Sequence, residues 1–171
     1  IYGGFSGVET NINERNLALN KTIISGSVST NEDLTSIPYY PYSGYIDQDY
    51  YTRLYSSAIF QCERDYTLDG LVIKNTFGNS GEGIIVSLSG NQALAKISNC
   101  DFVYNYSQDV VLGNNYTTYI YRNCNFAFNG IAGYSWLLDG NNIKATNCVF
   151  NNNTLWTLTQ NIITQNNINI T

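Results

Sequence analysis

Three cysteines recur at equal spacing and are the first residues of this sequence that could carry chemistry. Cys100, Cys124 and Cys148 follow one another with a constant 24-residue spacing, so a regular fold would place them in one column. Buried thiols commonly act as small hydrophobic groups. Neighbouring thiols could instead close a disulfide, because strands ~4.8 Å apart fall within the ~4.4–6.8 Å that separates disulfide-bonded Cα atoms. Both interpretations of the column stay open. The fourth cysteine, Cys62, lies outside the 24-residue spacing.

A metal centre is the third use of a cysteine column, and the composition argues against it. The chain has no histidine. A column that faces an apolar interior also offers no tetrahedral set of ligands. We therefore expect no metal ion and no other cofactor.

Carboxylates are the other candidates, because paired acids hydrolyse glycosides and clustered acids hold Ca²⁺ for lyase chemistry. The 13 acidic residues do not follow the 24-residue spacing: Asp101 is succeeded by Asn125 and Val149. Asp69 and Asp139 stand in glycine-containing turns, where Asp is a normal turn former. We therefore expect no catalytic residues and no enzymatic activity. A polysaccharide lyase or glycoside hydrolase is the less favoured alternative.

The cysteines belong to a longer motif, N-C-x-F-x-x-N, that occurs three times. The copies begin at Asn99, Asn123 and Asn147, and a weaker copy begins at Asn75. A fixed period of this length is typical of repeat architectures. The motif predicts three columns of equivalent residues: an asparagine ladder at a bend, an internal thiol column and an internal aromatic stack. Their members are Asn75, Asn99, Asn123 and Asn147; Cys100, Cys124 and Cys148; and Phe102, Phe126 and Phe150.

Apolar and polar residues alternate before each copy of the motif, which is typical of a strand with one buried face. The expected inward pairs are Leu71 and Ile73, Ala95 and Ile97, Tyr119 and Tyr121, and Ile143 and Ala145. No segment shows helical spacing, and a unit of three short strands cannot bury its own face without stacking on copies of itself. The sequence therefore predicts an all-β fold, a right-handed parallel β-helix (a solenoid) with 24-residue coils, forming one domain over residues 1–171.

Residues 30–57 break the spacing and are rich in tyrosine, so we interpret them as an insertion that protrudes from one coil. Tyrosine gives a large contact area at low entropy cost and is enriched in binding surfaces. The alternative is that the insertion simply covers a flank or an end of the coils. The candidate binding residues, for a surface glycan or a partner, are Tyr39, Tyr40, Tyr42, Tyr45, Tyr50 and Tyr51.

Composition narrows the class of protein. Only 12% of the residues are charged, the net charge is −5, and no basic patch is present, so we expect no nucleic-acid partner. No apolar run approaches the ~20 residues of a membrane span. The chain lacks Met and starts at Ile1, from which we expect a secreted, processed chain whose signal peptide has been removed. Glycosylation sequons occur at Asn20, Asn105, Asn115, Asn152 and Asn169.

Further motifs carry a resemblance over nearly the whole chain outside residues 30–60. They are Y-G-G-F-x-G-x-E-T at residues 2–10, R-N at 15–16, T-x-x-S-G at 22–26 and T-x-D-G-x-x-I at 67–73, together with the repeated F-x-x-N. The sequence resembles secreted bacterial right-handed parallel β-helix surface proteins, with repeats similar to those of polymorphic outer-membrane proteins. The resemblance implies a pectin-lyase-like fold, an extracellular or cell-surface location, and adhesion or scaffolding more often than catalysis.

Both ends of the expected stack lack a capping helix, and the segment 155–171 carries no charged side chain. Unprotected strand edges pair with other chains. We therefore expect a non-enzymatic extracellular structural protein that binds its own copies head to tail, in a filament or matrix. The alternatives are a glycan- or cell-binding adhesin that uses the Tyr-rich insertion, or an insertion that caps one end. The expected assembly residues are Ile1, Tyr2, Phe5, Ile168 and Ile170.

Overall fold

The computed structural model describes residues 1–26, 60–62, 64–76, 83–87, 93–107, 109–112, 117–131, 138, 142–155 and 167–170. The Tyr-rich insertion lies outside them, and with it the candidate binding residues Tyr39, Tyr40, Tyr42, Tyr45, Tyr50 and Tyr51. Within the described ranges the secondary structure is almost entirely β-strand, and its one helix is the short 3₁₀ turn η1 (Ile12–Glu14). No helix in this part of the chain is long and apolar enough to cross a membrane.

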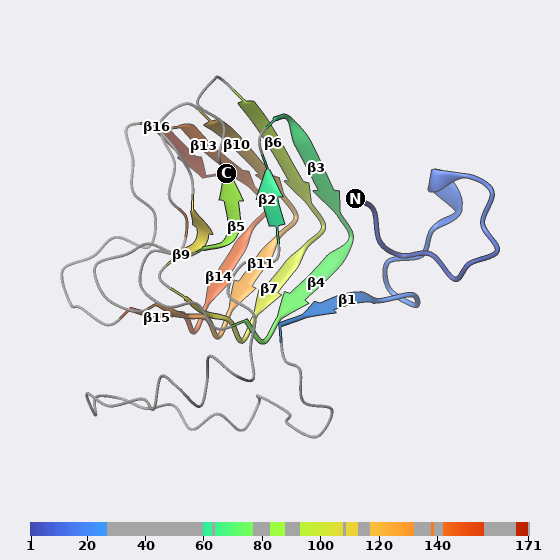
Figure 1. Cartoon of the computed structure of the whole chain (residues 1–171), viewed down its shortest axis with the longest axis horizontal. Coiled ribbons are helices and arrows are strands. Elements are labelled where there is room, and N and C mark those ends of the chain that lie inside the picture. The colour runs from blue at the N-terminus through green and yellow to red at the C-terminus, as the bar shows by residue number, and fades with distance from the viewer. Residues whose placement is uncertain are drawn as a thin grey trace.

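Two five-stranded sheets dominate the molecule (Figure 1). Sheet 1 has the order β1 (Thr22–Ser25), β4 (Leu71–Lys74), β7 (Asp101–Val103), β11 (Asn125–Ala127) and β14 (Val149–Asn151). Sheet 2 has the order β16 (Asn167–Ile170), β13 (Asn142–Thr146), β10 (Thr117–Arg122), β6 (Ala93–Ser98) and β3 (Tyr66–Asp69).

Two three-stranded sheets complete the described strands. One has the order β15 (Thr154–Leu155), β12 (Gly130–Ile131) and β8 (Tyr106–Ser107), and the other β2 (Phe60–Cys62), β5 (Gly83–Ser87) and β9 (Asp109–Leu112). The pairings between these strands, in all four sheets, are parallel. The prediction of an all-β fold with parallel strands is thereby confirmed.

Neighbouring strands of a sheet come from successive sequence repeats, so equivalent residues stand in columns along the sheet. The inward columns of sheet 2 are Tyr66, Ala95, Tyr119 and Ile143, and Leu68, Ile97, Tyr121 and Ala145. In the edge strand β16 the backbones of Ile168 and Ile170 pair in register with Ile143 and Ala145. Leu71 and Ile73, predicted to begin these columns, belong to sheet 1 instead.

The predicted register of Asn75, where the weaker copy of the motif begins, is wrong. Asn75 does not precede Asn99 in a column. It lies at the bend after β4 and donates its backbone N–H to Tyr104 O at 3.2 Å. The reason is that Thr76 stands 29 residues before its partner Asn105, whereas later repeats are spaced by 24 residues. The buried faces of the strands fix the pairing register, and a constant spacing does not.

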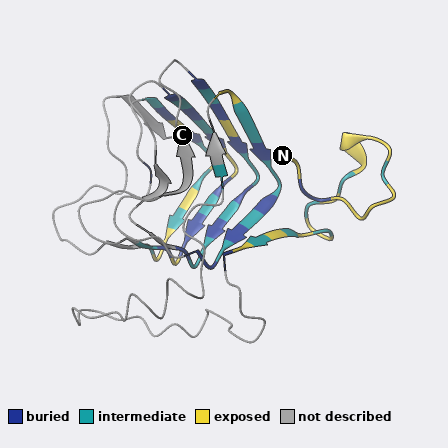
Figure 2. Cartoon of the chain, viewed as in Figure 1, coloured by how far each residue is buried: buried dark blue, intermediate teal, exposed yellow. Residues whose placement is uncertain are grey.

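The core lies between the two large sheets, where Figure 2 shows buried residues on the facing sides of their strands. A large ring alternates with a small side chain at one place in each column: Ala95 lies beside Tyr119, and Ala145 lies beside Tyr121. Such alternation lets the large rings fill the space beside the small side chains, as close packing requires.

The first residues extend sheet 2 beyond β3. Tyr2 forms a parallel bridge with Asp69, Gly3 N donates to Asp69 O at 2.7 Å, and Asp69 N donates to Ile1 O at 3.0 Å. Gly3 is required there because a Cβ atom would collide with the carbonyl oxygen of Gly70. The chain then leaves the sheets, and residues 4–21, here called the N-terminal arm, project beyond them before β1 returns to sheet 1 (Figure 1).

Candidate functional site

The first bend of each repeat carries an asparagine ladder on the surface. Asn99, Asn123 and Asn147 have backbone φ angles of 52°, 52° and 53°, a left-handed conformation that asparagine tolerates. Asn123 Nδ2 donates to Asn99 Oδ1 at 3.1 Å, and Asn147 Nδ2 donates to Asn123 Oδ1 at 3.4 Å. In the preceding repeat Gly70, at φ 74°, takes the bend that was predicted for Asn75, and Asp69 accepts from Asn99 Nδ2 at 2.8 Å.

A second asparagine ladder runs through the interior, and it was not predicted from the sequence. Asn105 Nδ2 donates to Asn129 Oδ1 at 3.0 Å, and Asn129 Nδ2 donates to Asn153 Oδ1 at 2.9 Å. Asn105 and Asn129 are each only 1% exposed. The signal for this ladder was the last residue of N-C-x-F-x-x-N. Because Asn105 is buried and hydrogen-bonded, it is also a poor glycosylation site in the folded protein.

Phenylalanines of the motif form the predicted internal stack. The rings of Phe102 and Phe126 lie 4.8 Å apart between centroids, and those of Phe126 and Phe150 lie 5.1 Å apart, with 3° between planes in both pairs. Phe102 and Phe126 are fully buried. The column extends to Ile73 and Ile24 in the earlier strands of sheet 1.

The thiol column also forms, and Cys100, Cys124 and Cys148 are free thiols. Cys100 and Cys124 are buried, which favours the interpretation as small core residues, whereas Cys148 is partly exposed. Burial raises the pKa of Cys100 to about 11. The Cys124 thiol shares a hydrogen bond with Cys148, which lowers the pKa of Cys148 to about 6 and raises that of Cys124. Cys62 pairs with Ser87 in another sheet, as its position outside the 24-residue spacing predicts.

Glu9 holds the N-terminal arm in a defined conformation. Its carboxylate accepts hydrogen bonds from Ser6 N, Ser6 Oγ, Gly7 N and Val8 N at 2.8–3.0 Å. These bonds, with Ser6 as the largest contributor, lower the pKa of Glu9 to about 2. The glutamate of Y-G-G-F-x-G-x-E-T therefore has a direct structural use in ordering the arm.

Arg15 attaches the arm to sheet 2. Arg15 Nη2 lies 2.8 Å from Asp69 Oδ2, with both side chains mostly buried, and its guanidinium stacks over the Tyr2 ring at 5.4 Å. Asn16 N donates to Gly4 O at 2.8 Å, which closes the base of the arm. Asp69 thus joins the arm to the surface asparagine ladder, since it accepts from Arg15 and Asn99 together.

Exposed large apolar side chains lie at two places in the described structure. Seven come from the segment 1–23, namely Ile1, Tyr2, Phe5, Val8, Ile12, Leu19 and Ile23. The other two, Phe128 and Val149, belong to the last two repeats of sheet 1. The predicted assembly residues Ile1, Tyr2 and Phe5 are 58%, 46% and 40% exposed. The backbones of Ile168 and Ile170 form the opposite edge strand of sheet 2.

The second bend of each repeat is also left-handed, with φ of 58°, 55°, 56° and 51° at Asn75, Tyr104, Phe128 and Asn152. This conformation costs a residue with a side chain about 1–2 kcal/mol, and Asn bears it best. Two repeats nevertheless carry aromatic residues. The rings of Tyr104 and Phe128 stack at 5.1 Å with 8° between planes, which returns only about 0.5–1.5 kcal/mol.

Acidic residues do not converge in the described part of the chain, and no group there could hold a metal ion. A shallow hollow of about 140 Å³ is lined by Asp65, Tyr66, Thr67, Leu94 and Lys96. Its one carboxylate, Asp65, accepts a hydrogen bond from Leu94 N at 2.8 Å. The hollow offers no second carboxylate among these residues for the acid–base pair of a glycoside hydrolase.

Comparison with known proteins adds no assignment: the chain matches no protein-family model, no curated protein and no solved structure. The internal ladders, the ordered arm and the apolar ends are therefore the features from which its function has to be inferred.

Proposed function

We propose that this chain is a right-handed parallel β-helix and a non-enzymatic extracellular structural protein, whose copies associate head to tail into a filament or matrix. The parallel sheets and the 24-residue register of their columns support the β-helix. The extracellular location rests on the low charge and on the resemblance to secreted β-helix surface proteins. The use of Glu9 and Arg15 of the shared motif to order the arm is in keeping with that resemblance.

The location of the exposed apolar side chains carries the proposal. A contiguous exposed apolar surface is a common sign of an interaction site. In the described structure such side chains gather on the N-terminal arm and the strand beside it, and Val149 is exposed in β14, the opposite edge strand of sheet 1. The arm is ordered by its own hydrogen bonds, so binding would require little further loss of conformational entropy.

The aromatic column gives the two ends a complementary geometry. Ile24 stands at one end of the column and Phe150 at the other, and both are only partly buried. If β1 of a second copy follows β14, Ile24 of that copy continues the stack on Phe150 at the strand spacing of ~4.8 Å. Contact between two different surfaces of the same chain is heterologous and produces an open filament.

The experiment blocks each end separately with a buried charge. Leu19→Asp alters the arm, where Leu19 is 80% exposed, and Val149→Asp alters β14, where Val149 is 55% exposed. Thr118→Asp adds the same charge on the outward face of β10, in the middle of sheet 2, and is the matched control. Sedimentation velocity and negative-stain microscopy over a dilution series measure the size of the particles.

We expect the wild type and the Thr118→Asp variant to form filaments, and each end variant alone to remain monomeric. An equimolar mixture of the Leu19→Asp and Val149→Asp variants must form dimers, because each supplies the intact end that the other lacks. Monomeric wild type at every concentration contradicts assembly. Monomers in the mixture, when each variant alone is also monomeric, contradict the head-to-tail arrangement.

A further inference from the structure

At the second bend of the repeats, two kinds of residue adopt the same left-handed backbone conformation. Asn75 and Asn152 occupy the outer positions, and Tyr104 and Phe128 the two between them, all with positive φ. The asparagines show which residue the bend itself requires. The aromatic side chains therefore serve a purpose beyond the bend.

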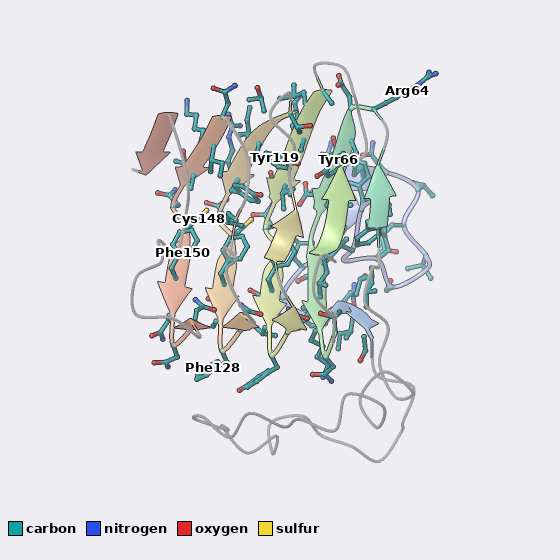
Figure 3. All side chains as sticks on the ribbon, turned by 60° about the vertical axis from the view of Figure 1, so that its left-hand side comes forward. Arg64, Tyr66, Tyr119, Phe128, Cys148 and Phe150 are labelled. Atoms are coloured by element: carbon teal, nitrogen blue, oxygen red, sulfur yellow. The ribbon has the colours of Figure 1, made fainter. Side chains whose placement is uncertain are left out.

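Core packing does not explain why aromatic residues stand at this bend. Phe128 is 46% exposed and Tyr104 partly exposed, although aromatic rings this close to a core are ordinarily buried. Figure 3 shows Phe128 at the lower edge of the sheets, projecting away from the strands, whereas Phe150 and Tyr119 lie among them. The rings contact each other through one face each. The other face of Phe128 is directed toward the repeat of Asn152, and that of Tyr104 toward the repeat of Asn75.

Uncharged polar residues stand beside the open face of Phe128. Asn152 is exposed and Asn153 partly exposed there, whereas Asn75, Thr76, Asn105 and Asn129 at the same bend are buried. Lys74 is partly exposed, stands one position before Asn75 and pairs in register with Val103, so one charge lies beside the Tyr104 end of the stack. At the Phe128 end, β11 and β14 carry no charged residue. A ligand on the open face of Phe128 therefore meets an aromatic ring and the amides of Asn152 and Asn153 rather than a charge, which disfavours an ionic polymer.

We propose that Tyr104, Phe128 and Asn152 form a binding site for the sugar rings of an uncharged polysaccharide. The apolar C–H face of a pyranose packs on the open face of Phe128, as one further ring in the stack. The exposed amide of Asn152 then donates to and accepts from the sugar hydroxyls. The site lies on the flank of the repeats and does not rest on head-to-tail assembly.

The test replaces the rings with the residue that the other repeats use. In the Tyr104→Asn/Phe128→Asn double variant every second bend carries Asn, so the bends keep their preferred backbone. Ile120→Asn, which removes a partly exposed apolar side chain from the outward face of β10, is the matched control. The probes are hydroxyethyl-cellulose and galactomannan as neutral polysaccharides and polygalacturonate as a charged one, each embedded in a native electrophoresis gel.

We expect at least one neutral polysaccharide to retard the wild type and the Ile120→Asn variant equally, and the double variant at least tenfold less. Thermal unfolding verifies that the double variant is folded. Retardation of the double variant equal to that of the wild type, or retardation of the wild type by polygalacturonate alone or by no probe, overturns the site. So does a double variant that loses only self-association, because the rings then pack against a second copy.

Two further measurements keep the test decisive if the double variant does not fold. Phe128→Tyr preserves the ring and must retain the retardation of the wild type. Saturation-transfer NMR on the wild type must transfer magnetisation from aromatic protons to the C–H protons of the neutral polysaccharide that retards it. Loss of retardation in Phe128→Tyr, or no transfer, overturns the proposal.

Discussion

Asn105 and Asn129 lie one above the other inside the molecule, with Asn105 Nδ2 3.0 Å and Asn105 N 3.1 Å from the same acceptor, Asn129 Oδ1. Asn129 repeats the arrangement toward Asn153, and its Nδ2 also donates to Phe102 O at 2.8 Å. The side-chain amides therefore satisfy backbone groups that the bend removes from the sheets. Buried polar groups need such partners, because an unsatisfied one is costly.

Replacing Asn129 with Ala is expected to destabilise the protein strongly. The change leaves the backbone and side-chain N–H groups of Asn105 and the carbonyl of Phe102 without their partner in the core. At about 1–3 kcal/mol for each buried unsatisfied group, we expect a loss of at least about 3 kcal/mol in the free energy of unfolding. Urea denaturation followed by circular dichroism measures it.

The control for that variant is Asn123→Gly at the exposed bend. Gly keeps the left-handed conformation of Asn123 and loses one ladder hydrogen bond in each direction at the surface. We expect less than about 1 kcal/mol of destabilisation, because water replaces the lost partners. Equal losses in the two variants would contradict the distinct role of the interior ladder.

Tyr121→Phe is expected to stabilise the protein. Tyr121 is fully buried, and its hydroxyl oxygen has no hydrogen-bond partner in the structure. Burial of that group raises the pKa of Tyr121 well above its usual value. Removing the hydroxyl should increase the free energy of unfolding by about 1 kcal/mol, measured by thermal unfolding. Tyr104→Phe removes a surface hydroxyl as the control, and a lower melting temperature for Tyr121→Phe would contradict the prediction.

Acid is expected to loosen the N-terminal arm. Glu9 has its pKa lowered from 4.5 to about 2 by the N–H and O–H donors of residues 6–8. A lowered pKa in the folded state means that the stabilisation is complete above about pH 4.5 and is lost as the pH falls through about 2. In NMR titrations the amide signals of Gly7 and Val8 should shift together in that window.

The matched variant for the acid experiment is Glu9→Gln. In this variant the amide signals of Gly7 and Val8 should lie, already at neutral pH, where the wild-type signals lie in acid. The amide signal of Asn123 in the surface ladder should keep its wild-type position. Midpoints near 4.5 for the wild-type signals would show that the carboxylate does not make these hydrogen bonds in solution.

Cys148 is expected to react with iodoacetamide before Cys100 and Cys124. It is partly exposed, and its hydrogen bond with Cys124 lowers its pKa below that of an ordinary thiol, so that a larger share of it is thiolate at neutral pH; thiolates are the reactive form. The alkylation rate should rise through about pH 6 and level off above it. Peptide mass mapping assigns the modified residue, and Cys148→Ser removes the fast phase.

Assembly is also expected to change the alkylation rate of Cys148. Cys148 precedes the edge strand β14, so a copy that pairs there should slow its alkylation at concentrations at which filaments form. A rate governed by a pKa near 9, or equal rates for Cys100, Cys124 and Cys148, would contradict the hydrogen bond from Cys124.

Much of this architecture could be predicted from the motif, because its residues report on the buried face. Cys100, Phe102 and their successors recur at one constant interval and do form columns. The failure at Asn75 has a physical cause: its residue type fits both left-handed bends, so identity alone does not reveal which bend it occupies. The interior ladder escaped notice because an asparagine beside a turn ordinarily indicates solvent exposure.

The pair of aromatic residues at the second bend was missed for a related reason. In the sequence, Tyr104 and Phe128 fall among apolar residues of short strands and give no sign of a positive φ. Only the backbone shows that they occupy positions where asparagine would suffice. The Tyr-rich insertion, which the composition favours as a binding surface, lies outside the described residues.

The unequal interval between Thr76 and Asn105 has a practical consequence. The strands on either side keep their register although this interval is 29 residues long and the next is 24. The hydrogen-bonded columns therefore tolerate length variation between Thr76 and Ala93. A foreign peptide could be grafted into that stretch, and the arrangement of the columns would not have to be redesigned.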